Sequence, residues 1–281
     1  MLAPMRIAFT KMHGLGNDFA VFDAPAGSAP LSGAQLHRLA DRHTGIGFDQ
    51  ALILQPPRRD DTAVYYRIFN ADGVEVEQCG NGARCIAALL ASRGLAPDGM
   101  VTMESPAGLI RARTRSGGAV SVDMGPVRFD PQALPFEASA QADRYRLRVG
   151  TETLEIGAVS VGNPHAVLAV DSVDSAPVSR LGPAIQGHER FPNRVNAGFM
   201  QVIDRSRIRL RVYERGAGET LACGTGACAA VAVGRRWGLL DPAVTVMVRG
   251  GELSVSWADS SESIWLTGPA EIAFEGHVEL S

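Results

Sequence analysis

The chain has 281 residues, 46% of them hydrophobic, and a formal charge of -3 spread over interleaved acidic and basic residues. This length suits two domains, and the charge offers no basic face for nucleic acid or an anionic membrane surface. No signal-peptide pattern opens the chain, and its apolar runs are shorter than the roughly 20 residues of a membrane span. We therefore expect a soluble cytoplasmic protein that binds neither nucleic acid nor membranes.

Short apolar segments separated by Gly, Pro and Asp predict strands in the first half at residues 6–10, 20–23, 52–55 and 64–70. A helix is predicted at residues 32–42, where Ser32 can cap the first turn. A second helix is predicted at residues 82–93, because Gly94 follows it as a stop signal. Three further strands are predicted at residues 101–103, 109–114 and 120–124.

The same order of elements begins again near residue 145. Strands at 153–159 and 166–170 precede a short helix at 178–186, and strands at 199–203 and 208–213 follow. A helix at 226–237 then ends at Gly238, before strands at 244–248, 253–257 and 264–266.

Four pairs of residues occupy corresponding positions in the two halves, at sequence separations of 146 (163 − 17), 146 (196 − 50), 144 (214 − 70) and 144 (223 − 79). The pairs are Asn17 with Asn163, Gln50 with Asn196, Asn70 with Glu214, and Cys79 with Cys223. Four markers in one order are hard to obtain by chance, so the chain is predicted to be duplicated. Two like domains are then expected to enclose one cleft, which is a preferred place for a ligand.

Cys79 and Cys223 each stand directly before a Gly-x-Gly that opens an apolar helix. The first turn of a helix has unpaired N–H groups and a partial positive charge, so a thiol there loses its proton more easily. The Gly80-Asn81 and Gly224-Thr225 turns can also bring backbone N–H groups close to a carboxylate. A buried packing role is the alternative for one such cysteine, but packing does not require the turn twice.

The other two cysteines, Cys85 and Cys228, fall inside the helices among apolar residues and are expected only to pack. Neither the spacing from Cys79 to Cys85 nor that from Cys223 to Cys228 matches a metal site or the Cys-x-x-Cys of a redox protein. We therefore expect no metal.

Acid–base groups on opposite faces of one carbon suit inversion of a stereocentre, because one removes a proton while the other delivers a proton. Many amino-acid racemases use pyridoxal phosphate as an electron sink, which requires a Schiff-base lysine. Lys11 is the only lysine in the chain, so a reaction without this cofactor is favoured. The carbanion must then be stabilised by helix N-termini in a closed site.

Polar residues at or near the duplicated markers suit an amino-acid ligand. Glu214 and Arg215 can bind an ammonium and a carboxylate, and His165 can tune a thiol or transfer a proton. A single asparagine is more often a turn residue than a ligand. These asparagines are candidate ligands only because they lie at or near the duplicated markers. The asparagines are Asn17, Asn70, Asn81, Asn163 and Asn196.

The same segments closely resemble the pyridoxal-independent diaminopimelate epimerases. They include Cys-Gly-Asn-Gly-Ala-Arg-Cys at 79–85 and Glu-Arg-Gly-Ala-Gly-Glu-Thr-Leu-Ala-Cys-Gly-Thr-Gly-Ala-Cys at 214–228. Matching segments also lie at 11–19, 45–50, 69–73, 162–165 and 194–196, so the resemblance spans nearly the whole chain. Proline racemases keep a cysteine pair in different surroundings, and phenazine-pathway relatives lack the pair.

The resemblance implies interconversion of LL- and meso-2,6-diaminopimelate, in lysine and cell-wall precursor synthesis, without a cofactor. It implies an α/β (α+β) fold of two pseudo-symmetric domains, each a curled, mainly antiparallel sheet around a central helix. The expected domains are residues 1–123 with the tail 269–281, and residues 124–268, with the active site in the cleft between them. A homodimer is also implied, although Phe274 stands where some members carry a tyrosine linked to dimerisation.

The resemblance also assigns roles to individual residues. Cys79 is implied as proton donor and Cys223 as acceptor, with the roles reversing in the other direction, while His165 and Glu214 modulate the thiols. The implied substrate-binding residues are Asn17, Gln50, Asn70, Gly80, Asn81, Asn163, Asn196, Glu214, Arg215, Gly224 and Thr225.

Three other functions stay open at this point. The same mechanism could act on another amino acid, although Arg215 and the asparagines favour a substrate with a second amino-acid-like end. The chain could instead be an amino-acid-binding protein without catalysis, which the retained cysteine pair argues against. It could also be a thiol–disulfide sensor built on Cys79 and Cys223, for which we expect oxidation to inactivate an enzyme instead.

Overall fold

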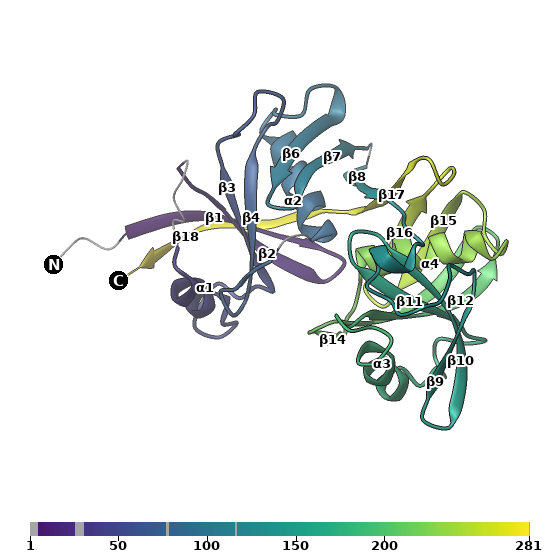
Figure 1. Cartoon of the computed structure of the whole chain (residues 1–281). Coiled ribbons are helices and arrows are strands. Elements are labelled where there is room, and N and C mark those ends of the chain that lie inside the picture. Colours follow the sequence, from purple (N-terminus) through teal and green to yellow (C-terminus); the bar gives the residue numbers. More distant parts are fainter. Residues whose placement is uncertain (1–4, 26–30, 77–78, 116, 281) are drawn as a thin grey trace. The chain divides into compact units, whose positions relative to one another are not determined.

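The computed structural model describes residues 5–25, 31–76, 79–115 and 117–280. The chain divides into two compact units, residues 1–122 with 268–281, and residues 123–267 (Figure 1). These bounds lie one residue from the expected domain bounds. The chain passes from one unit to the other within β8 (Ala119–Pro126) and returns within β17 (Ser263–Pro269).

The first unit is a long mixed sheet with two helices. Its strands pair in the order β18-β1-β2-β3-β4-β6-β7-β8, and β5 pairs with β4. The β2–β3 and β4–β6 pairs are parallel and the others are antiparallel. Its elements are β1 (Met5–Gly14), β2 (Asn17–Asp23), α1 (Gly33–Ala40), β3 (Gln50–Gln55), β4 (Tyr65–Asn70), β5 (Glu75–Val76), α2 (Gly80–Ser92), β6 (Met100–Ser105), β7 (Gly108–Thr114) and β18 (Glu271–Leu280).

The second unit repeats this plan. Its strands pair in the order β9-β10-β11-β12-β13-β15-β16-β17, and β14 pairs with β13. The parallel pairs, β11–β12 and β13–β15, fall at the same places as in the first unit. Its elements are β9 (Tyr145–Val149), β10 (Glu152–Ser160), β11 (Pro164–Ala169), α3 (Val178–Gln186), β12 (Asn196–Asp204), β13 (Arg207–Glu214), β14 (Gly218–Glu219), α4 (Gly224–Arg236), β15 (Ala243–Val248) and β16 (Gly251–Ser256). The predicted duplication and fold class are confirmed.

Each sheet curls around one apolar helix. Helix α2 contacts β1, β2, β6, β7 and β18, and α4 contacts β10, β11, β12, β13 and β16. Both helices are rich in Ala and Gly, so strands approach them on several sides. Every residue of α4 from Gly226 to Gly234 is buried. A helix that is apolar all round is stable only when it is buried in this way.

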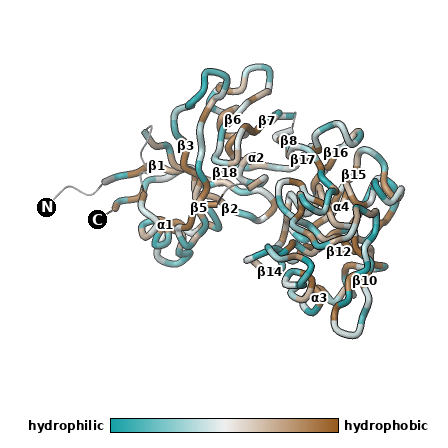
Figure 2. The backbone as a smooth tube through the Cα atoms, in the orientation of Figure 1, coloured by the Kyte–Doolittle hydropathy of each residue, from teal (hydrophilic) through white to brown (hydrophobic). Residues whose placement is uncertain are grey.

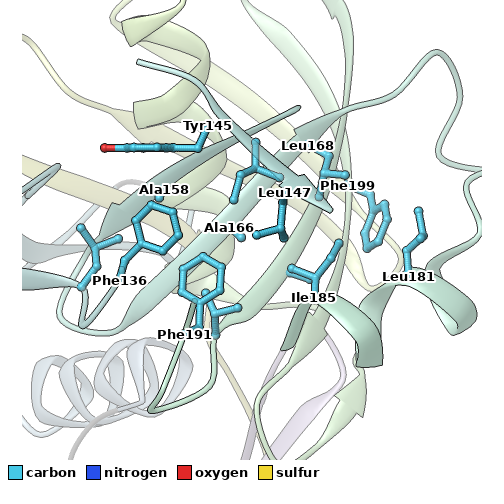
Figure 3. Packing of buried hydrophobic residues seen from close by; sticks show 14 of the residues in the cluster. Phe136, Tyr145, Leu147, Ala158, Ala166, Leu168, Leu181, Ile185, Phe191 and Phe199 are labelled. Carbon is cyan, nitrogen blue, oxygen red and sulfur yellow. The ribbon is translucent and has the colours of Figure 1, made fainter. Parts of the chain in front are cut away.

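The other face of each sheet packs against a second, amphipathic helix. In the second unit, Ile185 and Leu181 of α3 meet Phe199 and Leu147 of the sheet (Figure 3). In the first unit, Leu36 and Leu39 of α1 pack in the same cluster as β3, whose central residues are hydrophobic (Figure 2). Strands such as β12 are therefore covered by a helix on each face.

Several predicted bounds change. Helix α1 begins after Ser32, which caps it as predicted through a complete capping box, but it ends at Ala40, before residue 42. Helices α2 and α4 begin at Gly80 and Gly224, two residues earlier than predicted, because the cysteine itself is the cap. Strands β5, β9, β14 and β18 had no predicted counterpart. No helix among the described residues is long and apolar enough to span a membrane.

Candidate active site

In the first unit, three predicted site residues lie at neighbouring strand ends. The β1–β2 hairpin places Asn17 at the start of β2, and Gln50 opens β3 opposite Phe19. Gln50 is also the register partner of Asn70, and its Nε2 donates to Asn70 Oδ1 at 2.9 Å. The buried Oε1 of Gln50 accepts no hydrogen bond in the described part of the chain. This oxygen can therefore accept from a ligand ammonium, which would satisfy it.

The second unit brings its predicted residues together in the corresponding way. His165 in β11 pairs in register with Asn196, which opens β12. The side chain of Asn196 donates to Pro164 O at 3.2 Å and accepts from the backbone N of Arg215 at 2.7 Å. The guanidinium of Arg215 is exposed and donates through Nη1 to Asn193 O at 3.1 Å. Because a guanidinium has five N–H donors, others stay available for a carboxylate.

Cys79 and Cys223 are the N-caps of α2 and α4. Each has an extended backbone, and its Sγ accepts from the backbone N–H three residues later, Gly82 at 3.5 Å and Gly226 at 3.3 Å. A serine or aspartate usually occupies this position, and its oxygen makes the same bond. The predicted placement of both thiols at helix N-termini is confirmed by these caps.

The second glycine of each turn is closely packed. A Cβ at Gly226 would lie 2.8 Å from Val212 Cγ2 and 3.2 Å from Cys223 Sγ. At Gly82 it would lie 3.1 Å from Leu52 Cδ2. The glycines therefore let each helix begin directly against the sheet.

Two amide side chains lie close to Cys79. Its Sγ lies 3.8 Å from Asn17 Oδ1, which also accepts from Asn81 Nδ2 at 3.1 Å. The second unit has a matching bond from Asn163 Nδ2 to Thr225 Oγ1 at 3.4 Å. The duplicated Gly-Asn turn thus contacts the duplicated cysteine turn in both units.

The surroundings of Cys223 are anionic. Its Sγ donates to Glu214 Oε2 at 3.0 Å, while the hydroxyl of Thr220 donates to Glu214 Oε1. Burial first, and then the charge and hydrogen bond of Glu214, raise the pKa of the Cys223 thiol well above its usual value. The direction of this shift favours the protonated thiol of Cys223 near neutral pH.

His165 is buried and neutral. Burial, followed by the positive charge of Arg215, lowers its pKa to about 3. Its Nε2 lies 3.0 Å from Asn163 Oδ1, and Thr225 Oγ1 lies 3.5 Å from Cys223 Sγ. His165 thus has no direct hydrogen bond to Cys223 among the contacts of the described residues; Asn163 and Thr225 connect the two. Its modulating role stays a prediction.

The only lysine and the two other cysteines have structural surroundings. The Nζ of Lys11 is 2.5 Å from Asp18 Oδ2 and also donates to Gly47 O, so it lies in a buried ion pair. Cys85 and Cys228 are fully buried, and burial raises the pKa of the Cys85 thiol to about 12. Such a thiol is unreactive near neutral pH. Within the described ranges, no group of three or more His, Cys, Asp or Glu side chains could hold a metal ion.

Two residues near the cysteines were not predicted. Thr220 donates a hydrogen bond to the carboxylate of Glu214, and nothing in the sequence marked this residue, which directly follows β14. Arg84 is fully buried in α2 and contacts Asn81. A charged residue inside an apolar helix was the available signal for it.

Comparisons with known proteins show the family of the chain. A sequence profile of the diaminopimelate epimerase family matches residues 9–129 and 157–273. The diaminopimelate epimerases of Alkalilimnicola ehrlichii and Thioalkalivibrio sulfidiphilus are 54% and 55% identical to this chain, over 98% of it and 100% of each relative.

Solved structures share the fold at low identity. A hydroxyproline epimerase from Agrobacterium vitis with bound trans-4-hydroxy-L-proline superposes with a TM-score of 0.68 at 18% identity, covering 98% of this chain and 93% of that one. A phenazine biosynthesis protein of the PhzF family from Bacillus anthracis has a TM-score of 0.69 at 18% identity, with 98% and 99% coverage. The fold is thus common to proteins with different names.

Proposed function

Because the chain belongs to the diaminopimelate epimerase family, we propose that it interconverts LL- and meso-2,6-diaminopimelate in lysine and peptidoglycan precursor synthesis. The observation that carries the proposal is the repeated helix N-cap, a thiol that accepts a backbone N–H in each unit. Two such groups suit a reaction in which a proton leaves one face of a carbon and another proton arrives on the opposite face.

We propose that Cys79 and Cys223 act on opposite faces of the substrate Cα. One thiolate takes the Cα proton, the electron pair of that bond stays on the substrate as a carbanion, and the other thiol gives its proton to the far face. The first-turn N–H groups at Gly80 and Gly224 stabilise the negative charge through the substrate carboxylate. No pyridoxal phosphate is needed in this scheme, and the buried ion pair of Lys11 suits a structural role.

The raised pKa of Cys223 bears on the direction of proton transfer. As a thiol, Cys223 can donate to the substrate in the direction in which Cys79 accepts, the reverse of the order implied by the family resemblance. In the opposite direction Cys223 must first lose its proton, and Glu214 Oε2 at 3.0 Å is placed to accept it. Glu214 therefore modulates Cys223, while its charge also attracts a substrate ammonium.

The remaining polar side chains bind the substrate in this proposal. The Gln50 oxygen, which accepts no hydrogen bond from the described residues, and the amides of Asn70 and Asn196 suit ammonium groups. The exposed guanidinium of Arg215 suits the carboxylate of the distal amino-acid end. Asn17, Asn81, Asn163 and Thr225 line the cysteine turns.

The substrate can be tested directly. The purified protein should convert LL-diaminopimelate to the meso form, and the products should be resolved by chiral chromatography. Proline, hydroxyproline, glutamate and lysine serve as a comparison panel. Turnover of one of these in preference to diaminopimelate would keep the mechanism but replace the substrate, and binding without turnover would leave only an amino-acid-binding protein.

We also propose a cytoplasmic homodimer that binds no nucleic acid. Strand β18 pairs with β1 along its length, and it exposes Ile272 and Phe274, which are 44% and 51% accessible. Two large apolar side chains on one strand suit an interface between copies. Phe274 packs edge-on against Phe9, so its ring is held in place.

Phe274→Glu should therefore convert a dimer to a monomer, because a carboxylate would be buried against its symmetry mate. Light scattering after size-exclusion chromatography measures the mass. Leu95→Glu is the matched control, since Leu95 is 49% accessible in the same unit and lies outside β18. A dimer that survives Phe274→Glu would move the interface away from this strand.

A further inference from the structure

Arg84 is the largest fully buried side chain of the described residues. It lies in the second turn of α2, between Ala83 and Cys85, with 0% accessibility. Burial of a guanidinium is costly unless hydrogen bonds compensate it. The residue at the corresponding place in the second unit is Cys228 (228 − 84 = 144), so the duplicated fold does not itself require a cation here.

Arg84 contacts the turn that follows Cys79. Its Nη2 donates to Asn81 Oδ1 at 2.8 Å, and its Nε donates to Pro269 O at 3.4 Å. The guanidinium also lies against the β1–β2 hairpin, because a Cβ at Gly14 would be 3.3 Å from Nη2. Arg84 thus touches the cysteine turn, the hairpin that carries Asn17, and the returning segment of the first unit.

These contacts fix the direction of a chain of hydrogen bonds. Arginine can only donate, so Asn81 must turn its oxygen to Arg84 and its nitrogen to Asn17. At the other end the Asp49 carboxylate, which accepts, takes a bond from Asn17 Nδ2 at 3.0 Å. Both ends therefore require the oxygen of Asn17 to face Asn81 and the thiol of Cys79.

We propose that Arg84 is a positioning residue, which sets the amide orientations of Asn81 and Asn17 so that an oxygen is presented to Cys79. The inference rests on the proposed epimerase function. In the second unit a threonine hydroxyl, which can rotate, replaces Asn81 at this contact, and Glu214 provides the acceptor for Cys223. The first unit has amides instead, and an amide must be held in one of two orientations.

Two substitutions at position 84 separate donor direction from packing. Arg84→Lys keeps a group that only donates, so its kcat/KM should stay within a few-fold of the wild type. Arg84→Gln removes a costly buried charge, but its amide can donate or accept and no longer orients Asn81. Its kcat/KM should fall about 10- to 100-fold, as expected for misplaced reacting groups. Equal activity of the two variants would overturn the inference.

A double-mutant cycle shows whether Arg84 acts through Asn81. In an Asn81→Ala background, the additional loss from Arg84→Gln should nearly vanish. Cys85→Ala, a buried neighbour on the same helix, is the control, and its small effect should be the same in both backgrounds. Independent, multiplicative losses from Arg84→Gln and Asn81→Ala would show that Arg84 is merely structural.

The wild-type protein gives a measurement that does not depend on variant folding. With 15N-labelled asparagine, the side-chain NH2 groups of Asn17 and Asn81 should exchange slowly with heavy water and keep one set of signals. Rapid exchange or two sets of signals would contradict a fixed orientation. A wild-type protein without epimerase activity would contradict the proposed function. An active wild type, with Arg84→Gln and Arg84→Lys equally active, would contradict only this inference.

Discussion

Alanine at Cys79 or Cys223 should lower kcat/KM for LL-diaminopimelate by at least about 10³-fold, within the range of general acid–base catalysis. Each thiol is the only proton carrier on its face of the substrate in the proposed mechanism, so neither can replace the other. Steady-state epimerisation of purified variants measures the loss.

Cys85→Ala and Cys228→Ala are the matched controls. Both residues are fully buried in α2 and α4, within two turns of the caps, and neither is assigned a chemical role. Their kcat/KM should remain close to the wild-type value, while thermal melting reports any loss of packing. Full activity in Cys79→Ala or in Cys223→Ala would rule out a mechanism that uses both thiols.

Glu214→Gln should change both the ionisation of Cys223 and the rate. The negative charge of Glu214 disfavours the Cys223 thiolate. When the substitution removes this charge, the pKa of the Cys223 thiol should fall. Burial, the larger cause of the raised pKa, remains, so the fall is partial. The rate should decrease about 10²-fold or more, because the proton acceptor beside Cys223 is lost.

The ionisation can be followed by ultraviolet thiolate absorbance during a pH titration in a Cys79→Ala background. The Cys223 transition should move to lower pH in Glu214→Gln. Glu219→Gln is the control, because this carboxylate lies nearby in β14 but binds Arg211, at 2.7 and 2.9 Å. An unchanged transition in Glu214→Gln would mean that the carboxylate does not control Cys223.

Local patterns in the sequence predict much of this architecture. The Cys-Gly-x-Gly turns before apolar runs predict the starts of α2 and α4 to within two residues, because caps and glycine turns are short-range features. Ser32 predicts the start of α1 for the same reason. The repeated markers predict the duplicated order of strands, which the matching parallel pairs β2–β3 and β11–β12 confirm.

Contacts between distant segments could not be predicted in the same way. The bond of Cys223 to Glu214 depends on how β13 meets the turn before α4, and strand register is set by the assembled sheet. The role of Thr220 depends on the same contact. Arg84 is next to apolar residues in sequence, but its partners Asn81 and Pro269 are brought together only by folding. The family resemblance supplied the substrate, which spacing alone left as an unnamed amino acid.

Epimerisation in heavy water tests the central claim of two opposed thiols most directly. LL-diaminopimelate should yield meso product with one deuterium at the inverted Cα, while the remaining LL substrate gains almost none at early times. The reason is that one thiol removes the original proton and the other, equilibrated with solvent, delivers the new one. Meso product that keeps the original proton, or LL substrate that gains deuterium as fast as product forms, would indicate a single base and contradict the account.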